Sequence, residues 1–80
     1  MKLKTIKRQI NQLIEQNENG ELVDLESITY LKTTLQDKKV ACKYKLRHRI
    51  GFVKRERIEK KLKKVKACLK RLKLLQEAIL

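Results

Sequence analysis

Apolar residues recur at intervals of three and four along the first part of the chain, a spacing that predicts an amphipathic helix. The positions on this face are Leu3, Ile6, Ile10, Leu13 and Ile14. We expect the helix to cover about residues 2–18 and to stop at Gly20. Glycine readily adopts the left-handed backbone conformation that satisfies the last carbonyls of a helix.

A second amphipathic pattern predicts a helix over about residues 23–48, with Asp24 as its N-cap because a carboxylate can accept from the free amides of the next turn. Lys38 and Lys39 interrupt its apolar face. The apolar positions are Leu25, Ile28, Leu31, Leu35, Cys42 and Leu46.

A third pattern predicts a helix over about residues 52–78, and Gly51 decides how it joins the second. If the chain folds back at Ile50, apolar positions face each other in layers, so we favour a turn. If Gly51 instead lies inside one long helix, two chains would pair as an arm-exchanged homodimer. The layers are Leu25 with Leu75, Ile28 with Leu72, Leu31 with Leu69, Leu35 with Val65, and Cys42 with Ile58.

These helices predict a single all-α domain over residues 1–80. The first helix is shorter than the other two and can cover only one end of them. The expected fold is therefore a short three-helix bundle with a projecting antiparallel, coiled-coil-like basic arm of about residues 38–63. The composition agrees, since 41% of residues are hydrophobic, 39% are charged and Pro is absent.

Charge is distributed unequally between the two halves of the chain. Residues 1–40 carry seven Lys and Arg against six acids, whereas residues 41–80 carry fifteen against three. Such asymmetry in a chain of net charge +13 indicates an anionic partner: a nucleic acid, an acidic protein face or an anionic membrane.

The predicted arm collects cations at helical neighbour positions, so like-charged pairs outnumber opposite pairs and destabilise the helix unless an anion relieves them. It has no Asn or Gln between Asp37 and Gln76, which favours contact with phosphates over reading of bases. The candidate polyanion-binding residues are Lys43, Lys45, Arg47, Arg49, Lys54, Arg55, Arg57, Lys60, Lys61, Lys63 and Lys64.

The favoured hypothesis is a small non-enzymatic protein that binds nucleic acid, as RNA, ribonucleoprotein or DNA backbone, through this arm. A helix-turn-helix is rejected because Arg47 and Arg57 stand where that motif needs a small and an apolar residue. The alternative is an inhibitor or adaptor whose basic surface docks an acidic face of a partner protein. Membrane binding is disfavoured because the apolar face is narrow and Trp is absent.

No enzymatic, cofactor or metal chemistry is expected. His48 has no partner residues for catalysis, and Cys42 and Cys68 lack the spacing of a metal site. We expect both cysteines to be reduced, apolar-face residues in a cytoplasmic protein. Tyr44 is expected to pack while partly exposed, and Phe52 to close the turn.

Overall fold

Three helices account for most of the chain in the computed structural model, which describes residues 1–79. They are α1 (Leu3–Glu18), α2 (Leu25–Arg47) and α3 (Phe52–Ile79), and no strand occurs over the described range. The prediction of an all-α chain of three helices is confirmed, and residues 48–51 separate α2 from α3. Gly51 therefore belongs to a turn.

The first turn ends α1 in the way its glycine predicts. Gly20 has a φ of 76°, and its amide and that of Glu21 donate to the carbonyls of Asn17 and Gln16, at 3.2 and 2.9 Å. This is the Schellman arrangement of a helix C-terminus. Asp24 then caps α2, since its carboxylate accepts from the Glu26 amide at 3.0 Å.

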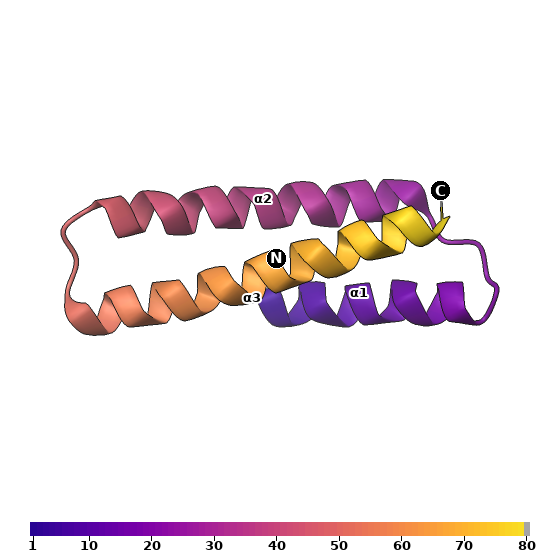
Figure 1. The fold of residues 1–80 in the computed structure, drawn as a ribbon, viewed down its shortest axis with the longest axis horizontal. Helices are drawn as coiled ribbons and strands as arrows, with labels where there is room; N and C mark the ends of the chain where they lie inside the picture. Colours follow the sequence, from indigo (N-terminus) through magenta and orange to yellow (C-terminus); the bar gives the residue numbers. More distant parts are fainter. Residues whose placement is uncertain (80) are drawn as a thin grey trace.

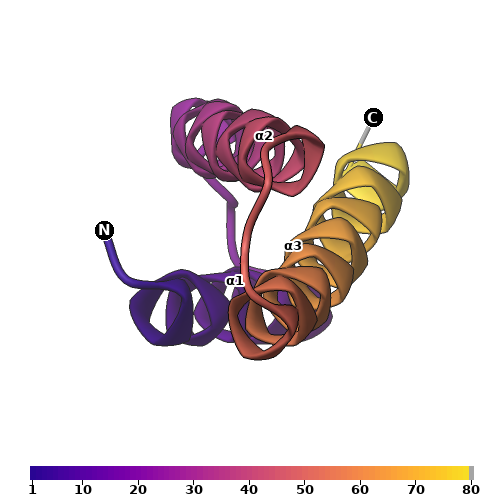
Figure 2. The same cartoon turned by 90° about the vertical axis from the view of Figure 1, so that its left-hand side faces the viewer.

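The helices form an elongated bundle of 47 × 19 × 16 Å (Figure 1). α2 and α3 lie side by side and run in opposite directions, and α1 lies along the later half of α3. Viewed from the end, α3 passes beside both α1 and α2 (Figure 2), so α3 is the helix that packs against each of the other two. The early half of α3 and the late half of α2 therefore extend beyond the start of α1.

The hydrophobic core is confined to the part of the bundle where all three helices meet. We call this part, residues 3–35 and 65–79, the three-helix end, and we call residues 38–64 the basic end. In the basic end only Cys42 is buried, while its other apolar contacts are half-buried or exposed. The core residues are Ile6, Ile10, Leu13, Ile28, Leu31, Leu35, Val65, Cys68, Leu72 and Leu75.

One detail of the predicted layers is wrong. Leu25 is 45% exposed, because it is the first residue of α2 and no preceding helical turn covers it. Cys68 is 2% exposed, and its neighbour Leu69 is half-buried and packs against the core. Burial of both Cys42 and Cys68 as free thiols agrees with their expected place on the apolar faces.

Candidate polyanion-binding surface

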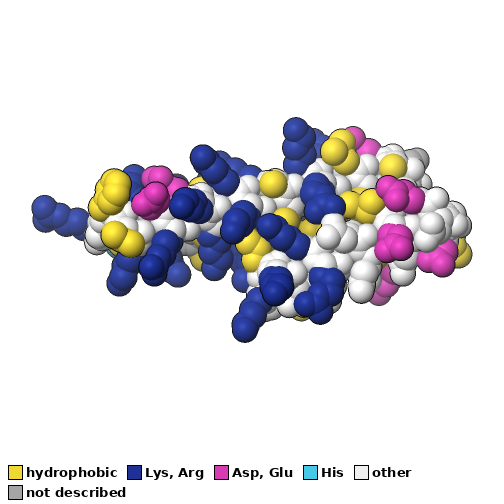
Figure 3. All heavy atoms as spheres, turned by 90° about the horizontal axis from the view of Figure 1, so that it is seen from below, with side chains coloured by type: hydrophobic (Ala, Val, Ile, Leu, Met, Phe, Trp, Pro, Cys, Tyr) yellow, Lys and Arg dark blue, Asp and Glu magenta, His cyan; other side chains and the backbone are white. Residues whose placement is uncertain are grey.

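All eleven cations selected from the sequence lie in the basic end, and all are exposed. They come from the last turns of α2, from the connecting loop and from the first half of α3. On the face seen in Figure 3, Lys and Arg side chains are spread over this half of the molecule, while most of the acidic side chains lie toward the opposite end. Residues 38–64 carry thirteen Lys and Arg and only two acids.

Only two of these cations form ion pairs within residues 1–79. Arg55 Nε lies 3.3 Å from Glu59 Oε1, and Lys60 Nζ lies 3.9 Å from Glu56 Oε1. All four side chains are at least half exposed, so water and salt screen both pairs. The basic end therefore presents a large excess of positive charge, because its other Lys and Arg residues form no ion pair within residues 1–79.

Arg55 differs from the other candidate residues because it also contacts the backbone of α2. Its Nη1 donates to the Leu46 carbonyl at 3.5 Å, near the negative end of the α2 dipole. The side chain therefore bridges the two helices beside their connecting loop.

Two aromatic side chains lie together at the end of α2. The rings of Tyr44 and His48 have centroids 4.3 Å apart at an interplanar angle of 47°. Nδ1 of His48 donates to the Tyr44 carbonyl at 2.8 Å, which satisfies one of the last carbonyls of the helix. His48 thus has a local structural role at the basic end.

The prediction that Phe52 closes the turn is wrong. Its side chain is 80% exposed, and that of its neighbour Val53 is 60% exposed. Phe52 is the first residue of α3, so no preceding helical turn covers its side chain. The tip of the basic end therefore combines exposed apolar side chains with cations.

A hollow of about 680 Å³ lies where the start of α1 meets the middle of α2 and α3. We call it the basic groove. Six cations line it together with Met1 and Leu3, and no acidic residue does. The cations are Lys2, Lys38, Arg57, Lys60, Lys61 and Lys64.

Lys2 and Lys38 are members of this groove that the sequence did not reveal. The structure brings them beside Arg57, although the three residues are far apart in the chain. A weak signal existed for Lys38, which interrupts the apolar face of its helix and is only half-exposed. No signal existed for Lys2, because its position depends on where α1 lies along α3.

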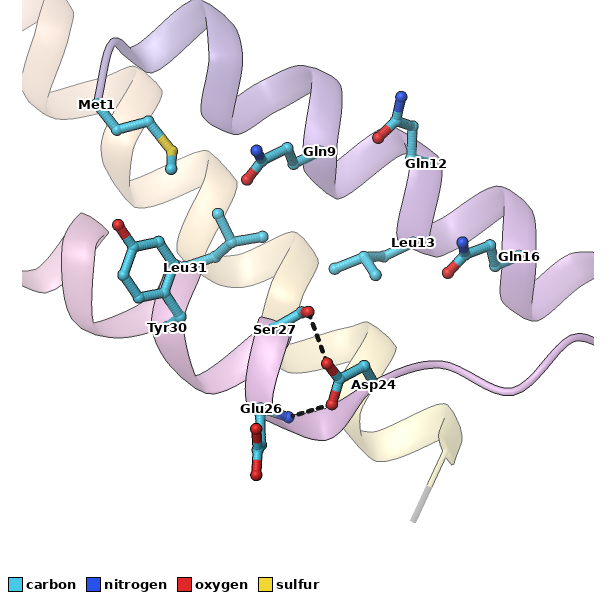
Figure 4. A pocket seen from close by; sticks show the side chains of 10 residues that line it. All are labelled: Met1, Gln9, Gln12, Leu13, Gln16, Asp24, Glu26, Ser27, Tyr30 and Leu31. Atoms are coloured by element: carbon cyan, nitrogen blue, oxygen red, sulfur yellow. Dashed lines mark hydrogen bonds between the residues drawn. The ribbon is translucent and has the colours of Figure 1, made fainter.

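A second hollow, of about 540 Å³, opens between α1 and α2 at the three-helix end. Figure 4 shows three amides of α1, Gln9, Gln12 and Gln16, along one side and Tyr30 on the other. No Lys or Arg lines it, and the carboxylate of Asp24 is occupied by local hydrogen bonds. The basic groove is therefore positively charged, whereas the second hollow is lined by amides, a tyrosine and acidic residues.

Within residues 1–79, no group of three His, Cys, Asp or Glu side chains is arranged to hold a metal ion. Over the same range, no helix is long and apolar enough to cross a membrane. Comparisons with protein-family models, with curated proteins and with solved structures found no match to this chain.

Proposed function

We propose that this protein binds the phosphate backbone of nucleic acid through its basic end, without catalysing a reaction. The observation that carries the proposal is the excess of exposed, unpaired cations over residues 38–64, contributed by two helices and the loop between them. In this interpretation, residues 38–63 act as an antiparallel, coiled-coil-like arm that places cations along an elongated surface.

The physical driving force would be the release of counterions from the phosphates as Lys and Arg replace them. Lys outnumbers Arg among the eleven candidate residues, and its ammonium acts as a point charge that needs no bidentate geometry. The arm also lacks Asn and Gln, which read adenine edges. These features favour recognition of charge and shape over recognition of sequence.

Salt dependence of binding provides the first test. If six to ten phosphates are contacted, affinity for an RNA or DNA duplex falls by about 10³–10⁵ between about 50 and 200 mM salt. The measurement is fluorescence anisotropy with labelled duplex and single-stranded probes across that range. Affinity that hardly changes with salt would overturn the proposal.

A matched pair of variants then locates the contact. Arg47→Gln, Arg49→Gln and Lys54→Gln together remove three exposed cations from the basic end. The control Lys66→Gln, Lys70→Gln and Lys73→Gln removes three from the three-helix end, so both proteins have the same net charge. We expect the first triple to weaken binding and to reduce the salt slope by about 3, and the control to change both little. Equal losses would refute a role for the basic end.

A second candidate function is binding to a partner protein, and one surface favours it. The outer face of α2 carries Tyr30, Val40 and Tyr44, which are 59%, 66% and 62% exposed. Thr33 and Asp37 complete this face at helical spacing, and no Lys or Arg interrupts it. Exposed tyrosines are common in protein interfaces. A defined protein partner that stays bound after nuclease treatment would support this function.

A further inference from the structure

We propose that the basic groove binds a compact group of adjacent phosphates, and that this group is the 5′-triphosphate end of an RNA strand. The inference rests on the proposed binding of nucleic acid and assigns a separate task to one part of the surface. Its basis is a hollow of about 680 Å³ lined by six cations, of which four lie on α3, one is Lys38 of α2, and one is Lys2, directly before α1.

The size of the groove suits a small charged group. Its volume lies within the range of about 300–1,000 Å³ that is typical of ligand clefts. Its lining has no carboxylate that would compete for the cations, and only Lys60 forms an ion pair within residues 1–79, with an exposed glutamate at 3.9 Å. The groove therefore gathers largely unneutralised positive charge in one hollow of the surface, which favours an anionic ligand.

The density of this charge distinguishes a polyphosphate from a continuous backbone. One strand of a duplex offers a single negative charge per about 3.4 Å of helix axis, with a sugar between successive phosphates. A triphosphate instead carries several negative charges on directly linked groups. Six cations grouped around one hollow, four from α3 and one each from α2 and the start of α1, match a compact group of charges better than an extended strand.

The start of α1 contributes positive charge at the same place. Lys2 is the N-cap of α1 and its side chain is a donor, so it leaves the first-turn amides without a side-chain acceptor. No acidic residue occurs in that first turn. Lys2 and Leu3 both line the groove, so the positive end of the α1 dipole adds to the field of the lysines.

The lining residues are mostly lysines, which can bind a phosphate group in more than one orientation. Five of the six cations are lysines, which can approach phosphate oxygens from several directions. Arg57 is the one side chain able to form a planar, bidentate contact with a phosphate. The apolar atoms of Met1 and Leu3 complete the wall without adding negative charge.

The test compares two RNAs of one sequence, one with a 5′-triphosphate and one with a 5′-hydroxyl, at about 0.15 M salt. At that ionic strength screening limits long-range attraction to about 8 Å, so the comparison reports local contacts. We expect the protein to bind the triphosphate RNA at least about tenfold more tightly, the equivalent of one charge-assisted hydrogen bond.

The groove variant is the triple Lys2→Gln, Lys38→Gln and Lys61→Gln, with one change at the N-cap of α1, one on α2 and one on α3. Its control is Lys4→Gln, Lys43→Gln and Lys63→Gln, which removes the same charge from the same three helices at exposed positions outside the groove. We expect the groove variant to lose the preference for triphosphate RNA. The control should weaken binding of both RNAs equally and keep the preference. Circular dichroism verifies that both variants remain helical.

The possible failures are distinguishable from one another. If the wild-type protein binds both RNAs equally and does not bind free tripolyphosphate, the groove assignment is wrong while the proposed function stands. If it binds neither RNA nor the duplex probes of the first test, both are wrong. If the groove variant still prefers the triphosphate RNA, the basic groove is not where the triphosphate binds. Binding of free tripolyphosphate without any preference for the RNA end would overturn the RNA-end assignment and identify free polyphosphate as the ligand.

Discussion

The two ends of this molecule are made from the same pair of helices but differ in how they are packed. At the three-helix end, ten residues form a continuous buried core. At the basic end, Cys42 is buried, while Leu46, Ile58 and Leu62 are only half-buried. The difference arises because α1 reaches no further than Leu3. A pair of helices without a third can bury only a narrow stripe on each.

Charge follows the same division. The three-helix end holds eight Lys and Arg against six acids, and the basic end holds thirteen against two. Self-repulsion therefore concentrates where hydrophobic burial is weakest. The two ends therefore have different physical roles. Hydrophobic burial at the three-helix end stabilises the fold, whereas the like charges of the basic end reduce its stability.

The largest expected difference comes from one substitution made at both ends. Leu72→Ala removes a side chain that is 0% exposed, and we expect it to destabilise the fold by about 2–5 kcal/mol. Leu62→Ala should cost less than half as much, because Leu62 is half-buried and the site is already open to water. Urea unfolding followed by circular dichroism measures both. Equal losses would show that the core extends into the basic end.

Helical periodicity predicted the three helices, and the capping preferences of glycine and aspartate predicted the end of α1 at Gly20 and the N-cap of α2 at Asp24. These features depend on residues close in sequence, where spacing and capping chemistry act directly. The predicted ranges of 2–18, 23–48 and 52–78 accordingly lie close to the observed bounds.

The basic groove could not be predicted in the same way. The groove exists because of where α1 lies along α3. A periodic pattern shows which face of a helix is apolar, but it does not show how far one helix is shifted along the axis of the next. Lys2 therefore had no reason to be grouped with Lys38. Phe52 was misassigned for a related reason, because the pattern marks an apolar residue without showing whether a neighbour covers it.

The two turns provide a sharper comparison of the ends. Gly20 has a positive φ, so Gly20→Ser should destabilise the protein by about 1–2 kcal/mol through backbone strain. Gly51 has no such φ, and an added Cβ meets nothing within 4 Å. Its carbonyl accepts the first helical bond of α3, from the Arg55 amide at 2.9 Å, so Gly51 occupies the N-cap position.

Gly51→Ser should therefore stabilise the protein by a few tenths to about 1 kcal/mol, because serine can cap α3 and restricts the unfolded chain. Thermal unfolding measures both effects: Tm should fall for Gly20→Ser and rise for Gly51→Ser, by about 4–8 °C per kcal/mol for a domain of this size. Destabilisation by both substitutions would mean that the loop at Gly51 is as constrained as the turn at Gly20.

The smallest expected effect tests whether the basic end accepts instability in exchange for charge. Lys61 lies one turn from Arg57 and Lys64 and has no acidic neighbour at that spacing. Lys61→Gln removes two repulsive pairs and should stabilise the fold by about 0.4–1 kcal/mol at low salt. The gain should vanish near 1 M salt, where the screening length is about 3 Å.

Glu59→Gln is the matched control on the same helix, since it removes the ion pair with Arg55 and should destabilise slightly under the same conditions. Unfolding and RNA binding are measured on both proteins. We expect Lys61→Gln to unfold at higher temperature while binding RNA more weakly, so that stability and affinity change in opposite directions. If Lys61→Gln lowers stability, repulsion is not what limits the basic end, and its cations do not need an anionic partner to be tolerated.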